Sequence, residues 1–230
     1  MHQELLQTIK SNLSRMYQLS MDQVIAPPFC AYCKKFLAKR TVFCMNCHDM
    51  IQPIVSVQLQ ITKSQSMTVI AIADYQEPLK TLLLSKSWSD ITVCKQLGKL
   101  IWEMTYFKHM PCDYLIPVPL HWLRHAKRGY NQADEIAKTL GKERNVPVAN
   151  ILARIKNTPF QSALAPELRA SNVKHAFAIK SSTNTALFEN KHVVLVDDLM
   201  TTGSTLIACA KQFLTLKPAS ITAVVVSRKV

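Results

Sequence analysis

Glycine is scarce in this 230-residue chain, which contains only Gly98, Gly129, Gly141 and Gly203. None of the four begins a G-x-x-x-x-G-K-[ST] loop or a G-x-G-x-x-G turn. P-loop NTPases and dinucleotide-binding folds need those glycines so that the backbone can approach a phosphate closely. Both classes of nucleotide-binding protein are therefore excluded.

Long apolar runs are missing as well. The first twenty residues are polar at every third or fourth position, and they lack the apolar block of about 7 to 15 residues that a secretory signal needs. The longest apolar stretches, such as residues 67–73, are far shorter than the roughly 20 residues of a membrane-spanning helix. We therefore expect a soluble, cytoplasmic protein.

Acidic residues are outnumbered, because 28 Lys and Arg stand against 15 Asp and Glu and leave a formal net charge of +13. A surplus of this size favours partners rich in phosphate, namely nucleotides, nucleic acid or an anionic membrane surface. Charge alone leaves these three kinds of partner open. The hydrophobic content of 48% is enough for one core with a small additional module.

The apolar pattern predicts two parts with a boundary near residue 55. Residues 1–55 hold an amphipathic helix over about 1–24 and a cysteine-rich segment. Residues 56–230 alternate short apolar runs with helical windows, which predicts an α/β fold with a mainly parallel sheet and helices on both faces. The expected strands cover 68–74, 113–120, 191–198 and 221–227, and the expected helices cover 77–108, 129–143 and 204–216. A long basic stretch before the third of these strands is predicted to be irregular.

The seven cysteines are an odd number, and four of them form two close pairs with the spacing C-x2-C-x10-C-x2-C: Cys30, Cys33, Cys44 and Cys47. Each pair can turn two thiolates toward one point, which predicts a small zinc ribbon whose structural Zn²⁺ site is closed to water. An iron–sulfur cluster is an alternative, and so is His48 in place of one thiolate. The scattered thiols Cys94, Cys112 and Cys209 are expected to be small core residues in a reducing compartment.

The loop between the two cysteine pairs is basic. It contains Lys34, Lys35, Lys39 and Arg40, and it contains no acid. Such a loop either binds nucleic acid or exposes a solvated face. The residues leave both interpretations open.

Residues 193–205 read VVLVDDLMTTGST. The four apolar residues predict a central strand buried on both faces, so the residues after them lie at the carboxyl edge of a parallel sheet, where such folds bind ligands. Thr201 to Thr205 offer N–H groups and hydroxyls at a helix start, which suits a phosphate. Asp197 and Asp198 would repel that phosphate unless they hold hydroxyls or a cation, and a ribose diol with Mg²⁺ nearby meets this need. A solvated turn without a ligand is the alternative.

This segment resembles the phosphoribosyl-pyrophosphate (PRPP) signature of type I phosphoribosyltransferases over all thirteen positions. The resemblance implies that the two acids bind the ribose diol and that the loop binds the 5′-phosphate. The PRPP-binding residues are then Asp197, Asp198, Leu199, Met200, Thr201, Thr202, Gly203, Ser204 and Thr205.

Two further segments, PVPLHWLRHAKRGYNQADEIAKTL at 117–140 and RIKNTPFQSALAPELRASNVKHAF at 154–177, resemble the competence protein F (ComF, GntX-like) family. That family joins a four-cysteine module to a phosphoribosyltransferase fold, and the resemblance runs from about residue 28 to residue 228. It implies a role in handling single-stranded DNA during natural transformation, with proteins of the DNA-uptake machinery as partners. Two departures are Tyr130 in place of Phe, and Ser89 in place of a glycine in KSWSD.

Basic residues near the predicted ligand edge are candidates for contacts with phosphate. The strand that ends in PVPL meets the same sheet edge as residues 193–205, so the basic residues after it can face the pyrophosphate of PRPP. These residues are His121, Arg124 and Arg128, and the resemblance adds Lys86, Arg154, Gln161 and Arg169. For the first three the alternative is a solvated side chain, or a capping or core position for the histidine. Basic residues interleaved with rings also predict a track for single-stranded DNA, with a solvated surface as the alternative. The nucleic-acid candidates are Lys34, Lys35, Lys127, Arg128, Tyr130, Lys156 and Lys174.

Three functions are compatible with these residues. The first is a ComF-like protein that handles single-stranded DNA and binds PRPP. The second is a working phosphoribosyltransferase that passes ribose 5-phosphate from PRPP, with Mg²⁺, to a nitrogenous acceptor in nucleotide metabolism. The third is a regulator that senses PRPP without catalysis. No dedicated general base is visible, and the acceptor cannot be identified from the residues.

Overall fold

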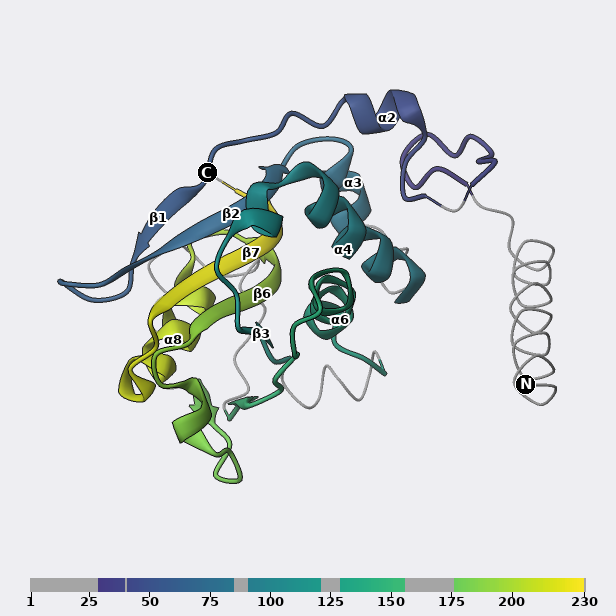
Figure 1. Ribbon diagram of the computed structural model, residues 1–230. Coiled ribbons are helices and arrows are strands. Elements are labelled where there is room, and N and C mark those ends of the chain that lie inside the picture. The colour runs from purple at the N-terminus through teal and green to yellow at the C-terminus, as the bar shows by residue number, and fades with distance from the viewer. Residues whose placement is uncertain (1–28, 40, 85–90, 121–128, 156–175, 230) are drawn as a thin grey trace, which may run out of the picture. The chain divides into compact units, whose positions relative to one another are not determined.

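The computed structural model describes residues 29–39, 41–84, 91–120, 129–155 and 176–229, and Figure 1 shows their helices and strands. The helix expected over residues 1–24 lies outside this part of the chain. Two compact units divide the protein, one from Met1 to Asp49 and one from Met50 to Val230. The functions assigned to the two parts stay predictions.

The second unit is built on a five-stranded sheet with the strand order β1-β2-β7-β6-β3. Its strands are β1 (Val57–Gln60), β2 (Ser66–Asp74), β3 (Tyr114–Pro117), β6 (His192–Met200) and β7 (Ser220–Arg228). Strands β2, β7, β6 and β3 are parallel, and β1 joins β2 as an antiparallel edge. The predicted mainly parallel sheet is confirmed.

Helices cover both faces of this sheet (Figure 1). Helix α8 (Ser204–Phe213) packs on β6 and β7, whereas α4 (Ile91–Met104) contacts β2 and β7, and α6 (Gln132–Arg144) contacts β3 and β6. Side chains of a strand point alternately to its two faces. Val193 and Leu195 accordingly join the core with α8, and the intervening Val194 is buried as well. This explains why β6 is a continuous apolar run.

The prediction of one continuous helix over 77–108 is wrong. The structure has α3 (Leu79–Leu84), α4 and a 3-10 helix, η2 (Tyr106–His109). The break after α4 lies at Thr105, whose backbone is extended. Its hydroxyl donates a hydrogen bond to the carbonyl oxygen of Ile101 at 2.7 Å and accepts one from the N–H of Phe107. Thr105 thus closes one helix and caps the next.

The basic stretch that was predicted to be irregular contains a two-stranded antiparallel sheet. It consists of β4 (Leu152–Arg154) and β5 (Phe177–Ile179). Leu152 and Phe177 are buried in the same core cluster as α8. Three-residue strands separated by so much chain leave no local periodicity to detect. The helix predicted over 204–216 is α8, followed by the 3-10 turn η5 (Leu214–Leu216); another 3-10 turn, η4 (Thr185–Phe188), precedes β6.

An ion pair lies at the carboxyl ends of β2 and β7. Asp74 and Arg228 are register partners, and the Arg228 Nε donates to the Asp74 Oδ1 at 2.9 Å. The Arg228 Nη1 donates to the backbone carbonyl of Val55 at 2.9 Å. Because Arg228 is only 8% exposed, loss of either partner would leave a buried donor unsatisfied. This pair fastens the segment before β1 to the end of the sheet.

No helix among the described ranges is both long and apolar enough to cross a bilayer.

Candidate functional site at the carboxyl end of β6

The two neighbouring acids of the predicted ligand segment lie within β6 and not beyond it. The strand continues through Met200, and its ladder with β7 reaches the Met200–Arg228 pair. The prediction had ended this strand at Asp198, and the pairing of Leu199 and Met200 with β7 extends it by two residues. Asp197 and Asp198 are both half-buried.

Backbone hydrogen bonds orient both carboxylates. The N–H of Asp198 donates to the Asp197 Oδ1 at 2.9 Å, and the N–H of Leu199 donates to the Asp198 Oδ1 at 2.7 Å. Each acid therefore accepts from the residue that follows it. Since a carboxylate oxygen has more than one lone pair, both groups keep the capacity to accept from a ligand hydroxyl.

The environment of Asp197 opposes its negative charge. Burial, followed by the charge of Asp198, raises the pKa of Asp197 well above its ordinary value. The N–H of Asp198 and the guanidinium of Arg154 act in the opposite direction. A half-buried acid with a raised pKa beside a second acid is typical of a functional site.

Arg154 brings a positive charge from β4 toward this carboxylate. Its guanidinium carbon lies 5.4 Å from the ring centroid of Phe177, its partner in the β4–β5 ladder. Its charge also acts on Cys209 of α8, whose pKa is raised by burial and by the charge of Asp197. Arg154, Asp197 and Cys209 are therefore electrostatic neighbours. The sequence prediction had given Arg154 to a hood over the pyrophosphate, and that role stays a prediction.

The turn between β6 and α8 is closed on its inner side by an apolar residue. Gly203 has φ +73° and is the residue before the first turn of α8. A Cβ at this position would lie 2.5 Å from the Cδ1 of Leu59 in β1. The backbone conformation therefore favours glycine, and a Cβ here would also force the Leu59 side chain to move. Sequence reasoning missed Leu59, because a contact between residues so far apart has no local signal.

Hydroxyl groups gather at the same turn. The Thr202 Oγ1 and the Ser204 Oγ are 2.7 Å apart, and the N–H of Ser204 donates to the Thr202 Oγ1 at 3.4 Å. They stand at the amino end of α8, where the helix dipole favours an anion. Two carboxylates that can accept hydrogen bonds from hydroxyl groups, and a set of donors for an anion, thus lie at the same end of β6.

The end of β3 lies beside the end of β6. The N–H of Val118 donates to the carbonyl of Val196 at 2.8 Å, and the Asn131 Nδ2 donates to the carbonyl of Val118 at 2.9 Å. The Asn131 Oδ1 accepts from the N–H of Ala133 and so caps α6. The RGYNQ element therefore has a structural asparagine that the sequence prediction passed over, although asparagine before a helix is a recognisable cap signal.

Most of the predicted basic contacts cannot be placed. Tyr130 and Arg154 are described and half-buried. The remaining candidates of the second unit lie outside the described residues, so their roles stay predictions: Lys86, His121, Arg124, Lys127, Arg128, Lys156, Gln161, Arg169 and Lys174.

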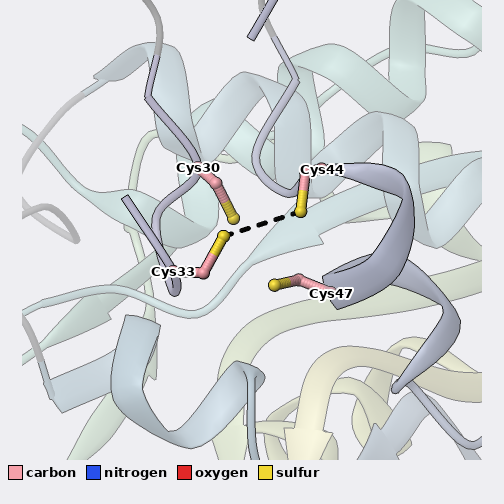
Figure 2. Close-up of side chains that lie close together, drawn as sticks. All are labelled: Cys30, Cys33, Cys44 and Cys47. Atoms are coloured by element: carbon pink, nitrogen blue, oxygen red, sulfur yellow. Dashed lines mark hydrogen bonds between the residues drawn. The ribbon is translucent and has the colours of Figure 1, made fainter. Parts of the chain in front are cut away.

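The first unit brings its four paired cysteines together (Figure 2). The Sγ atoms of Cys30, Cys33, Cys44 and Cys47 all lie within 4.8 Å of one another, and those of Cys33 and Cys44 are 3.6 Å apart. Cys44 directly precedes the short helix α2 (Met45–Asp49), and Cys47 lies within it. Among the described residues this group of thiols forms a possible metal site.

The pKa values of Cys30 and Cys47 are shifted in opposite directions. Burial acts to raise the pKa of Cys30, but N–H groups of the Cys44, Cys33 and Tyr32 backbone outweigh it and lower this pKa to about 6. Burial and the neighbouring thiols raise the pKa of Cys47 to about 12. A metal cation among the sulfurs would favour the thiolate form of both.

The other predicted features of the cysteines have mixed outcomes. The ring of His48 lies beside Asp49, with 3.5 Å between its Nδ1 and the Asp49 Oδ1, and the metal-ligand group contains only cysteines. Cys94 and Cys209 are buried core residues as predicted. Cys112 is only half-buried, and burial raises its pKa to about 11.

Comparison with known proteins settles the family. Over 192 residues the chain is 34% identical to competence protein F of Haemophilus influenzae, a match that covers 80% of this chain and 77% of that protein. This chain belongs to the competence protein F family. The family's phosphoribosyltransferase component is found as well, because a phosphoribosyl transferase domain model matches residues 125–230. That match contains β6, both acids and α8.

Two further relatives carry another name. The DNA utilization protein YhgH of Escherichia coli O157:H7 is 30% identical over 154 residues, which cover 64% of this chain and 65% of that protein. The protein of the same name from Salmonella typhimurium is 25% identical over 194 residues, covering 80% of this chain and 83% of that protein. The resemblance inferred from the sequence motifs is thus confirmed.

The raised pKa of Asp197 predicts how stability depends on pH. Because the folded-state pKa exceeds the ordinary 3.8, the folded protein binds this proton more tightly than the unfolded chain. Wild-type stability therefore falls as pH rises from the unfolded value through the folded one. Asp197→Asn cannot ionise, so we expect it to be more stable than wild type at pH 7 and to lose this advantage toward about pH 4.

Urea denaturation across this pH range measures the difference. Asp198→Asn is the matched comparison, since it removes one cause of the raised pKa of Asp197 and should reproduce part of the gain. A gain from Asp197→Asn that does not change with pH would contradict the assignment.

Proposed function

We propose that this member of the competence protein F family handles single-stranded DNA during natural transformation, in the cytoplasm, and binds PRPP with its phosphoribosyltransferase domain. The PRPP assignment is carried by one observation, the meeting of two oriented carboxylates with a hydroxyl-bearing turn at the carboxyl end of β6. The DNA assignment is supported by the names of the relatives and by the net charge of +13.

Different residues at the carboxyl end of β6 bind different parts of PRPP. Asp197 and Asp198 accept hydrogen bonds from the two ribose hydroxyls. These bonds offset the unfavourable free energy of burying the carboxylate charges. The hydroxyls of Thr202 and Ser204, with the amino end of α8, donate to the 5′-phosphate. Mg²⁺ supplies positive charge to the pyrophosphate when it is bound.

Turnover of PRPP is a second candidate function, favoured by the match to a phosphoribosyl transferase domain. Departure of pyrophosphate would leave a sugar with oxocarbenium character, which two carboxylates bound to its hydroxyls would stabilise. Release of pyrophosphate from PRPP and Mg²⁺ separates this candidate from a third function, a sensor that binds PRPP and leaves it intact.

We also propose that the four thiols hold a structural Zn²⁺. Four sulfurs at about 2.3 Å from a tetrahedral zinc lie about 3.8 Å from one another, close to the 3.6 Å between the Sγ atoms of Cys33 and Cys44. Four thiolates leave no coordination position for water. The site would therefore stabilise the first unit and take no part in chemistry.

PRPP binding is tested by calorimetry with PRPP and Mg²⁺. We expect Asp197→Ala combined with Asp198→Ala to abolish binding, because it removes both acceptors of the ribose hydroxyls. Glu189→Ala is the control, since Glu189 is an exposed acid and its loss changes the net charge in the same direction. Retained binding in the double variant would remove the ribose assignment.

DNA binding is tested with a labelled single-stranded oligonucleotide at 50 and 200 mM salt. With as few as three phosphate contacts we expect affinity to fall about twentyfold between these concentrations, because bound counterions are released from the strand. No measurable binding, or binding that does not depend on salt, would contradict the DNA assignment, whatever the result with PRPP.

Metal content is tested by elemental analysis of the purified protein. We expect about one zinc per chain, with loss of zinc and of the first unit's stability in Cys30→Ser, because three sulfurs leave the site open. Cys112→Ser is the control, since Cys112 is a half-buried thiol outside the cluster. A Cys30→Ser protein with full zinc content would exclude the four-thiolate site.

A further inference from the structure

Two aromatic rings stand exposed on the first unit. Phe29 is 54% exposed and Phe36 is 61% exposed, although phenylalanine is normally buried. The unit does bury other apolar side chains, namely Leu37, Val42 and Phe43. The two exposed rings are therefore not the core of this unit, and their position outside it calls for a ligand.

The rings form a defined pair. Phe29 and Phe36 face each other across an antiparallel bridge, and their ring centroids lie 6.0 Å apart at an interplanar angle of 80°. This edge-to-face arrangement is a favourable one for two aromatic rings. We call the two residues the ring pair.

The turn that carries the first two cysteines also fixes the ring pair. In the segment between Phe29 and Phe36, the N–H of Cys30 donates to the carbonyl of Lys35 at 2.8 Å, and the N–H of Lys34 donates to the carbonyl of Cys30 at 3.0 Å. The rings are thus positioned before any ligand arrives, which lowers the entropy cost of binding.

Basic residues lie close to the ring pair in the sequence. Lys34, Lys35 and Lys39 are exposed, and the described residues 29–39 contain no acid. The Lys34 Nζ donates to the carbonyl of Ala31 at 2.9 Å, which holds one ammonium group beside the turn. An apolar protein surface would match the rings and leave these charges without partners. A strand with planar bases and a phosphate at each step matches both.

We infer that the ring pair is a stacking surface for unpaired bases, with Lys35 and Lys39 contacting the phosphates of the same single strand. This inference rests on the proposed DNA function and deepens it, since it gives the first unit a ligand-binding role besides its metal site. Stacking on rings accepts any base, so the surface would bind single strands with little dependence on sequence.

The test replaces both rings in two ways within the full chain. Phe29→Leu with Phe36→Leu keeps apolar volume and removes the aromatic faces, whereas Phe29→Tyr with Phe36→Tyr keeps the faces. We expect the leucine pair to bind a single-stranded oligonucleotide about fivefold more weakly or worse, and the tyrosine pair to bind within about twofold of wild type. Zinc content of both proteins reports whether the first unit is intact.

An oligonucleotide with abasic positions separates stacking from charge. Wild type should lose affinity for the abasic strand, the leucine pair should bind both strands alike, and the salt dependence should be the same in all proteins. Leucine variants that bind like wild type, or that weaken equally on both strands relative to wild type, would overturn the inference.

Cross-linking locates the contact independently. An oligonucleotide with 5-iodouracil should cross-link to Phe29 or Phe36, and cross-links confined to residues 50–230 would contradict the inference. If wild type binds DNA in a salt-dependent way but the ring variants, the abasic strand and the cross-links all give the contrary result, the proposed function stands and the ring pair takes no part in it. If the leucine pair instead changes the oligomeric state with DNA binding intact, the ring pair is a protein interface.

Discussion

The candidate site depends on how β6 is held in the sheet. Parallel neighbours pair with it on both sides, β7 and β3, and its four apolar residues, 193–196, are buried. A strand fixed on both edges and both faces has no freedom to shift its register. The two acids near its carboxyl end, the turn after it and the start of α8 are therefore placed with little tolerance.

This position carries a cost in stability. Asp197 is half-buried beside Asp198, and its raised pKa shows that the fold disfavours its charge. Nothing in the packing of the sheet requires an acid there, because a neutral side chain of similar size would avoid the repulsion. Such local conflict is characteristic of residues kept for a ligand.

Local patterns were sufficient to predict much of this arrangement. The apolar run from Val193 to Val196, the alternation of strands with helices, and the spacing of the four cysteines each act over a few residues, and each was confirmed. The strand end was misjudged, because the pairing of Leu199 and Met200 with β7 is a contact with distant chain. The β4–β5 sheet was missed for the same reason. The exposure of Phe29 and Phe36 is also invisible in sequence, because it depends on how the rest of the unit packs.

The close approach of Leu59 to the turn at Gly203 makes the register of β1 matter for the candidate site. Leu59 lies on β1, whose register with β2 is set by the Val57–Val69 pair, and β1 follows the cysteine-rich unit by only a short segment. Adding one residue within β1 would turn Leu59 to the opposite face of the strand and leave the turn without its inner wall. Cysteine-rich modules exchanged between relatives would therefore have to be joined before Val57, so that the register of β1 and the turn at Gly203 stay unchanged.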